Sequence, residues 1–405
     1  MGVATTSAAP TPVASPRPAG RRGRAAAWYA AFAVYAGGVA ALSGPGLDRR
    51  WGIWAVGGYA SAAVLAWCWR SRGRQAALAA SLAGALAAPV VWLATQAPAT
   101  PDVTVVTRSA ALLLRHGSPY LAPAQLAHGG VLAYNPYLPV MTVLGLPRAL
   151  GLPGLAGDPR PWLAAVTFLL LAAAFRAAAQ PGPLRRAAFA TASPLIAFPI
   201  ALGITDPPVL ALTCLALALL ASPAWPVARR AWLDAVVVGV ASAMKYTAWP
   251  ALAVLTATIV ARDGARAAAR FAAIAAATTL TLLVALAPAS LTAPAALIQN
   301  TIMFPLGLTA ARTPAQSPLP GHLLATVGPA GHVAAIALLI TAGVAIAASL
   351  LIRPPADTTA AARRLALGLA LMFALSPATR FGSFAYPLGL LGWIALSRES
   401  APDLT

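Results

Sequence analysis

Lys245 is the only lysine in this 405-residue chain, and every other member of the Lys and Arg residue types in it is an arginine. It interrupts the stretch GVASAMKYTAWPALAVL, whose other residues are typical of a membrane helix. One interpretation is a cation that snorkels to the membrane surface. The alternative is a functional residue, because an ionisable group within an apolar segment is costly and usually serves binding or chemistry. A compact ammonium group there suits the phosphate of a long-tailed membrane anion.

A general base can be sought by elimination, because the chain has only nine acidic residues. Seven of them lie where a structural role is expected, at predicted cytoplasmic helix ends, in turns beside arginines or in the C-terminal tail. They are Asp48, Asp158, Asp234, Asp263, Asp357, Glu399 and Asp403. Asp102 and Asp206 remain, both at the predicted outer face. Either carboxylate could accept a proton from a hydroxyl group. Otherwise Asp102 would be a helix N-cap, and Asp206, in GITDPP, would form a turn.

Further cations accompany these acids. Arg380, in SPATRFGSFAYP, lies between two predicted spans on the outer side, where arginine is unusual, and this indicates an anionic ligand. The stretch PDVTVVTRSAALLLRHGSPY predicts an amphipathic helix on the membrane surface, ended by Gly117. Its Arg108 and Arg115 are two turns apart, so they could face one anion or meet lipid headgroups.

The composition indicates that these residues belong to a membrane protein. The chain is 60% hydrophobic and only 9% charged, with a mean hydropathy of +0.76, whereas a soluble domain has roughly a quarter of its residues charged. Continuous rather than alternating apolar runs predict an all-α polytopic membrane protein and not a barrel. The predicted spans are 25–43, 51–69, 76–97, 161–180, 187–204, 207–221, 231–244, 247–261, 271–289, 332–352, 363–376 and 381–397.

The net charge of +19 does not indicate nucleic-acid binding, because the arginines lie mostly in short segments between apolar runs. That pattern orients membrane helices and predicts a multi-pass plasma-membrane protein with a cytoplasmic N-terminus. Residues 1–24 are predicted to be a disordered cytoplasmic tail, with a cleaved signal peptide as the alternative. Residues 25–397 then form one transmembrane domain, and 398–405 a C-terminal tail.

Two long segments, 98–160 and 290–330, are predicted to lie outside the membrane. Within the first, residues 136–150 are apolar but short and rich in proline, so a re-entrant piece and a short span both remain open. Both cysteines, Cys68 and Cys214, lie in apolar runs, where a structural disulfide is not expected.

Two of the apolar stretches are interrupted, one by TDPP at residues 205–208 and the other at Lys245. Broken helices are tolerated at membrane depth only beside protein or a water-filled cavity. The two breaks therefore predict a polar cavity near the outer surface, and the Pro- and Gly-rich segment 290–330 is predicted to cover it as a lid that a ligand orders.

Several motifs in a fixed order resemble a known family over roughly residues 98–395. They are LLLRHGSPY, YNPYLP, ASPLIAFPIALGITDPPVLAL, GVASAMKYTAWP and FPLGLTAARTPAQSPLPGHLL. Together they look like actinobacterial membrane proteins of glycosyltransferase family 87, of the GT-C type. The resemblance implies a GT-C-like helix bundle of about 12 to 13 membrane segments with outer surface helices. It also implies inverting transfer of a sugar, often mannose, from a polyprenyl-phosphate donor to a hydroxyl of a cell-envelope glycan or glycolipid.

The resemblance also implies site residues. Asp102 fits the position of the catalytic acid in the first large outer loop. The predicted substrate-binding residues are Lys245, Arg380, Asp206, Arg108, Arg115, His116, Tyr120, Tyr134, Asn135, Arg312 and His322. Many GT-C proteins carry paired acidic residues in that loop, whereas this chain has only PDVT. A divalent cation is therefore left open and no metal ligand is assigned.

Two other functions share some of these features. A transporter or lipid-carrier flippase would also use broken helices and buried charges, but no internal repeat favours it. A non-catalytic protein of envelope assembly would be consistent with the small number of acids.

Overall fold

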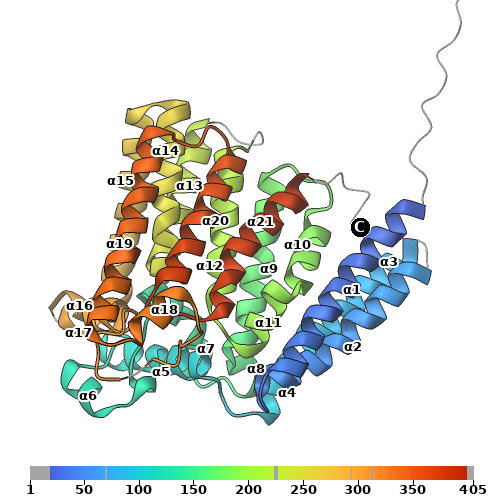
Figure 1. The fold of residues 1–405 in the computed structure, drawn as a ribbon, viewed down its shortest axis with the longest axis horizontal. Coiled ribbons are helices and arrows are strands. Elements are labelled where there is room, and N and C mark those ends of the chain that lie inside the picture. The colour runs from blue at the N-terminus through green and yellow to red at the C-terminus, as the bar shows by residue number, and fades with distance from the viewer. Residues whose placement is uncertain (1–18, 69–70, 223–226, 293, 312, 399–405) are drawn as a thin grey trace, which may run out of the picture.

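The chain forms a bundle of helices in the computed structural model, which describes residues 19–68, 71–222, 227–292, 294–311 and 313–398 (Figure 1). Within these ranges the only β contact is an isolated bridge between Gln316 and Thr379. The predicted all-α fold is confirmed.

Seven helices in the described residues are long and apolar enough to cross a membrane. These segments are Gly23–Leu42, Leu47–Cys68, Gly73–Gln96, Pro159–Ala177, Ala265–Leu286, Pro329–Ile352 and Thr358–Leu375. They belong to α1 (Ala19–Leu42), α2 (Leu47–Cys68), the continuous run α3 (Ser71–Leu82), η1 (Ala83–Ala87) and α4 (Ala88–Gln96), α9 (Pro159–Ala177), α15 (Ala265–Leu286), α19 (Pro329–Ile352) and α20 (Thr358–Leu375).

Further apolar helices complete the bundle. They are α10 (Pro183–Ala192), α11 (Pro194–Leu202), α12 (Asp206–Leu220), α13 (Val227–Met244), α14 (Trp249–Asp263) and α21 (Ala385–Arg398). Every predicted span overlaps one of the helices of the bundle. The predicted span 187–204 is divided, because Ser193 is extended and Pro194 begins a new helix.

Short helices gather at one end of the bundle, at the bottom of Figure 1. From residues 98–160 come α5 (Pro101–His116), α6 (Pro123–His128), η2 (Val131–Ala133), η3 (Pro139–Gly145), α7 (Leu146–Ala149) and α8 (Gly154–Gly157). From later segments come α16 (Ala289–Thr292), α17 (Pro294–Ile298), η5 (Gln299–Met303), α18 (Pro320–Ala325) and η6 (Phe381–Phe384). The elements η3 and α7 are each too short to cross a bilayer, so residues 136–150 do not form a spanning helix.

The first helix begins ahead of the predicted span 25–43. Helix α1 starts at Ala19, so residues 19–24 of the predicted tail are helical, while the predicted division into tail and membrane domain stays a prediction. Arginine is a good helix former, which suits a helix that includes this arginine-rich stretch. Residues 1–18 lie outside the described residues, as does most of the predicted C-terminal tail. Helix α21 continues to Arg398.

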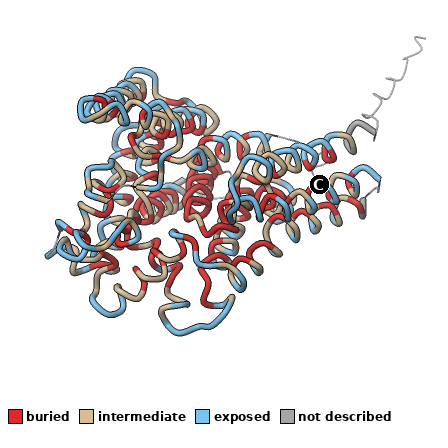
Figure 2. The backbone as a smooth tube through the Cα atoms, turned by 60° about the horizontal axis from the view of Figure 1, so that its bottom comes forward, coloured by how far each residue is buried: buried red, intermediate tan, exposed pale blue. Residues whose placement is uncertain are grey.

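The core follows the middle of the bundle, where buried residues concentrate (Figure 2). Nearly all of α12 is buried, while the N-terminal helices α1, α2 and α3 lie to one side of the bundle (Figure 1). Aromatic rings join that group to α10, because Phe32 packs on Phe189 with ring centroids 5.8 Å apart. Tyr59 of α2 also donates a hydrogen bond to the carbonyl of Ala192.

Candidate active site

Asp102 lies in the first turn of α5, but it is not the N-cap. Thr100 is the N-cap, because its hydroxyl accepts a hydrogen bond from the amide of Val103, and Pro101 occupies the first helical position. The N-cap interpretation of Asp102 is therefore wrong: proline suits the first helical position, so Pro101 begins the helix and the cap is Thr100, two residues before Asp102. The Asp102 carboxylate is left available for other contacts.

The start of α5 is joined to the end of α11. The Thr100 hydroxyl donates a hydrogen bond of 2.7 Å to the carbonyl of Leu202. Helix α11 then ends at Gly203, which adopts a left-handed conformation with φ of 77°. Asp206 opens α12 three residues later, so this junction brings the two candidate acids to one end of the bundle.

Gly203 is required at this junction for two reasons. Its positive φ disfavours any residue with a Cβ atom, and an added Cβ would meet the side chain of Val103 on α5. Gly203→Ala should lower the free energy of unfolding by about 1 kcal/mol or more, because alanine is strained at positive φ. Thermal unfolding in a fixed detergent would measure the loss. Gly343→Ala in α19 is the control, since open space surrounds Gly343 and no loss is expected there; equal unfolding temperatures for the two variants would contradict this role.

Lys245 occupies the predicted helix break between α13 and α14. Its backbone is extended, and η4 (Tyr246–Ala248) leads into α14. Its ammonium group forms an ion pair and hydrogen bond with Asp206 Oδ1. Their side chains are only 14% and 12% exposed. The lone lysine and one of the two candidate acids are thus direct partners.

Tyr137 connects this pair to Asp102. Its hydroxyl donates a hydrogen bond to Asp102 Oδ1, and its ring centroid lies 5.4 Å from the Lys245 ammonium nitrogen. Burial, and then the Asp102 carboxylate, raise the pKa of the Tyr137 hydroxyl well above its ordinary value. The hydroxyl therefore stays protonated and remains a donor to Asp102.

The backbone around Tyr137 is held by several hydrogen bonds. Its amide donates to Asn135 Oδ1, and its carbonyl accepts from the Tyr120 hydroxyl at 2.9 Å. The next amide, of Leu138, donates to the carbonyl of Met244 beside Lys245. Tyr120 and Asn135, both predicted substrate ligands, thus position Tyr137.

Arg380 approaches Asp102 from another element. Its Nη1 lies 3.8 Å from Asp102 Oδ2, and its side chain is 42% exposed. Ser317 holds the residues on both sides of Arg380: its amide donates to the carbonyl of Thr379, and its hydroxyl accepts from the amide of Phe381. The loop before η6 therefore presents a partly exposed cation to the acid.

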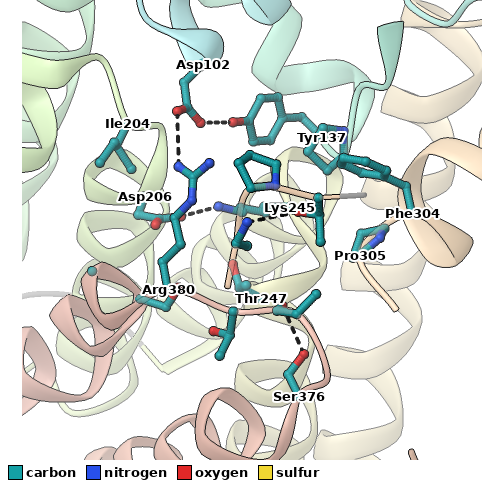
Figure 3. Close-up of a pocket in the computed structure, with 18 of the residues that line it drawn as sticks. Asp102, Tyr137, Ile204, Asp206, Lys245, Thr247, Phe304, Pro305, Ser376 and Arg380 are labelled. Carbon is teal, nitrogen blue, oxygen red and sulfur yellow. Dashed lines mark hydrogen bonds and ion pairs between the residues drawn. The ribbon is translucent and has the colours of Figure 1, made fainter. Parts of the chain in front are cut away.

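These groups face a single cavity of about 200 Å³, seen in Figure 3 with its dashed ion pairs and hydrogen bonds. Two carboxylates and two cations line it, together with tyrosines and apolar side chains. Its other polar and aromatic lining residues include Tyr134, Tyr246, Thr247, Phe304, Thr313, Phe373, Ser376, Thr379, Ser383 and Tyr386. The four charges sum to zero, so an entering anion must compete with the carboxylates for their cations.

Other predicted site residues lie differently. Tyr134 lines the cavity and stacks on Phe304, with ring centroids 4.6 Å apart. Arg108 does not line the cavity, because its guanidinium donates to the carbonyls of Leu132 and Ala133. Arg115 and His116 lie exposed at the far end of α5.

Segment 290–330, the predicted lid, contains two more predicted ligands. His322 Nδ1 is 2.9 Å from the carbonyl of Pro377 and does not line the cavity, while Arg312 lies outside the described residues. Phe304, Pro305, Thr313, Pro314 and Ala315 form part of the cavity wall. The segment 290–330 is therefore beside the cavity as predicted, and its ordering by a ligand stays a prediction.

Few side chains near this cavity could coordinate a metal ion. Among the described residues no group of three or more His, Cys, Asp or Glu side chains lies close enough to hold one. Asp102 and Asp206 are each paired with a cation, which competes with a metal for the same oxygens. The described donor set does not fit a metal centre.

Together these features define a polytopic helical membrane protein with a charged cavity at one end of its bundle. The fold is similar to the crystal structure of ArnT from Cupriavidus metallidurans bound to undecaprenyl phosphate, with a TM-score of 0.50. The similarity covers 80% of this chain and 60% of the ArnT chain, at 20% sequence identity. It confirms the predicted GT-C-like fold. No protein-family model matches the sequence, and no curated protein matches it.

Proposed function

We propose that this protein is a membrane glycosyltransferase that moves a hexose from a polyprenyl-phosphate donor to a hydroxyl of a cell-envelope glycan or glycolipid. The observation that carries the proposal is the cavity in which two carboxylates and two cations meet at one end of a membrane bundle. The ArnT structure with undecaprenyl phosphate supports a polyprenyl-phosphate ligand. The resemblance of its motifs to glycosyltransferase family 87 favours mannose and inversion.

The donor phosphate is assigned to Arg380 and Lys245. Arg380 is the more exposed cation and is paired with Asp102 only at 3.8 Å, so an incoming phosphate can recruit its guanidinium first. Lys245 lies deeper and is held by Asp206. Phosphate binding to both cations would stabilise the leaving group as the sugar departs.

Asp102 is assigned as the general base. The acceptor hydroxyl attacks the anomeric carbon of the sugar while the bond between that carbon and the phosphate oxygen breaks. The hydroxyl proton passes to Asp102, and the electron pair of the broken bond leaves on polyprenyl phosphate. Attack opposite the leaving phosphate inverts the anomeric carbon.

The role assigned to Asp206 is to hold the Lys245 side chain in place. A mostly buried ammonium group is costly without a counter-charge, and the Asp206 carboxylate supplies one directly. Asp206 also lies at the start of α12, where a helix N-terminus favours a carboxylate. Asp206 therefore keeps the phosphate-binding cation charged and directed into the cavity before the donor arrives.

The orientation proposed for the bundle places this cavity outside the cell. Arg185, Arg262, Arg353 and Arg398 lie at helix ends far from the cavity, as expected if that end is cytoplasmic. The acceptor would then be an envelope component on the outer face of the plasma membrane.

Tyr137→Phe should lower the maximal transfer rate about ten- to a hundredfold while leaving donor affinity unchanged. The ring stays beside Lys245, but Asp102 loses the hydrogen bond that orients its carboxylate, and one such bond to a charged group contributes about 1.5–3 kcal/mol. Rates measured at saturating donor would show the loss. Tyr35→Phe, in α1, is the control; a change in donor affinity with an unchanged rate would contradict positioning of the base by Tyr137.

The proposed function is tested with purified protein in liposomes that contain a polyprenyl-phosphate hexose labelled in the sugar. In the presence of a cell-envelope glycolipid extract, we expect the label to leave the polyprenyl carrier and enter the extract. Labelled donor that crosses the membrane with its sugar still attached would instead identify a flippase. Unchanged donor on its original side would support neither activity.

A further inference from the structure

A second cavity, of about 110 Å³, lies between helix α1 and the main bundle. Six helices contribute its lining: Trp28, Phe32, Leu171, Phe175, Phe189, Ala190, Ser193, Leu195, Ile196, Leu210, Cys214, Gly389, Gly392, Trp393, Ala395 and Leu396. Apart from Ser193 and Cys214, its lining is hydrocarbon and aromatic, and the Ser193 hydroxyl is already bonded to the carbonyl of Ala190. The cavity therefore suits a hydrocarbon chain.

This second cavity is separate from the charged one. Cys214 lies eight residues beyond Asp206 on α12, and Leu396 lies ten beyond Tyr386 on α21. At 1.5 Å per residue, the second cavity reaches about 12–15 Å further along the bundle than the acids and cations. A ligand could occupy it without touching the proposed donor site.

Polar donors without partners lie on α21 beside this cavity. Trp393, which is 7% exposed, has a buried indole nitrogen with no hydrogen-bond partner among the described residues. The hydroxyl of Ser397, one turn further along the same helix, is likewise buried and unpartnered among them. A buried donor without an acceptor costs about 1–3 kcal/mol, so a ligand carbonyl at this level would be stabilising.

Arginines lie beyond Ser397, at the end of the bundle far from the charged cavity. Arg398 ends α21, and exposed Arg185 lies one turn before the lining residue Phe189 on α10. The two helix ends are joined, because the guanidinium of Arg186 donates a hydrogen bond to the carbonyl of Leu396. Arg24 of α1 lies one turn before Trp28 and adds a third positive charge from a cavity-lining helix.

The order along α21 matches the parts of a lipid. From the end inward come a cation, a hydroxyl, an indole N–H and Gly392, whose missing side chain leaves room for a chain. We propose that this cavity binds an anionic glycerophospholipid, with one acyl chain beside Gly392, an ester carbonyl at Trp393 and the phosphate at Arg185 and Arg398. Basic pockets between membrane helices on the cytoplasmic side are suited to such headgroups.

Gly392 provides a direct test of the acyl-chain position. A Cβ atom added there meets nothing within 4 Å, so a larger side chain would enter the cavity without displacing the protein around it. Leucine in place of glycine also favours a helix. Gly392→Leu should therefore keep the unfolding temperature in lipid-free detergent and lose the bound phospholipid.

The experiment is native mass spectrometry of the full chain titrated with phosphatidylglycerol or with phosphatidylcholine of the same acyl chains. We expect tighter binding of phosphatidylglycerol, little binding of it by Gly392→Leu, and roughly fivefold weaker binding for each of Arg185→Gln and Arg398→Gln, at about 1 kcal/mol per cation. Arg353→Gln, an exposed arginine at the end of α19, is the matched control and should bind like the parent protein.

Three results would overturn the proposal. Equal binding of the two phospholipids would contradict a site for the anionic headgroup. Undiminished phosphatidylglycerol binding by Gly392→Leu would show that the chain lies elsewhere. Displacement of phosphatidylglycerol by polyprenyl phosphate at equal concentration would assign the cavity to the donor lipid instead. None of these readouts depends on glycosyl transfer. The lipid-binding proposal is therefore tested independently of the proposed function.

Discussion

Asp102→Asn is expected to bind a polyprenyl-phosphate sugar as the parent protein does and to lose transfer by about 10²–10⁴-fold, the usual contribution of a general base. Asparagine keeps the size of the side chain and can still accept a hydrogen bond from Tyr137, but it cannot take the acceptor proton. The fold should be kept, because Thr100 rather than Asp102 caps α5. Initial rates of label transfer and donor titrations would give both quantities.

Asp263→Asn is the control for that variant, since Asp263 is exposed at the end of α14, far from the cavity. It should transfer at the normal rate. Near-normal transfer by Asp102→Asn would exclude Asp102 as the base and move that role to Asp206, the other acid that lines the cavity.

Lys245→Ala should weaken donor binding by about ten- to a hundredfold, because a hydrogen bond to a charged group contributes about 1.5–3 kcal/mol. It should also lower stability, since removing one partner of a buried ion pair costs about 3–5 kcal/mol when the other charge stays behind. Donor titrations and thermal unfolding in the same detergent would separate the two effects. Arg270→Ala, an exposed arginine of α15, should change neither.

The double variant Lys245→Met with Asp206→Asn makes the donor-binding test independent of stability. It removes both charges of the pair and leaves no buried carboxylate without a partner. We expect its unfolding temperature to recover towards that of the parent, whereas donor affinity should stay low. Normal donor affinity in this double variant would show that the ion pair is purely structural.

The sequence predicted the helical bundle because continuous apolar runs leave few alternatives in a membrane. It also predicted the two helix breaks, because Pro207 and Pro208 and the lone lysine are unmistakable within apolar stretches. The direct pairing of Lys245 with Asp206 could not be read from the chain, since 39 residues separate them and only the packing of α12 on α13 brings them together.

Two residues that shape the site, Tyr137 and Ser317, are not among the predicted site residues. Tyr137 stands in the YNPYLP motif beside the predicted residues Tyr134 and Asn135, and nothing in the local sequence indicates which tyrosine faces Asp102. Ser317 was missed because its partners, the residues around Arg380, lie more than 60 residues away. The regular helical spacing of Arg108 and Arg115 predicts an anion site, whereas the carbonyls of Leu132 and Ala133 in η2 bind the Arg108 guanidinium instead.

The central claim is that the charged cavity binds the donor phosphate. A cryo-electron microscopy structure of the protein in nanodiscs with added polyprenyl phosphate tests it most directly. We predict phosphate density within hydrogen-bond distance of the Arg380 guanidinium and the Lys245 ammonium group, with Arg380 drawn away from Asp102. Density for the phosphate elsewhere on the bundle, with both ion pairs of the cavity unchanged at saturating ligand, would contradict the claim.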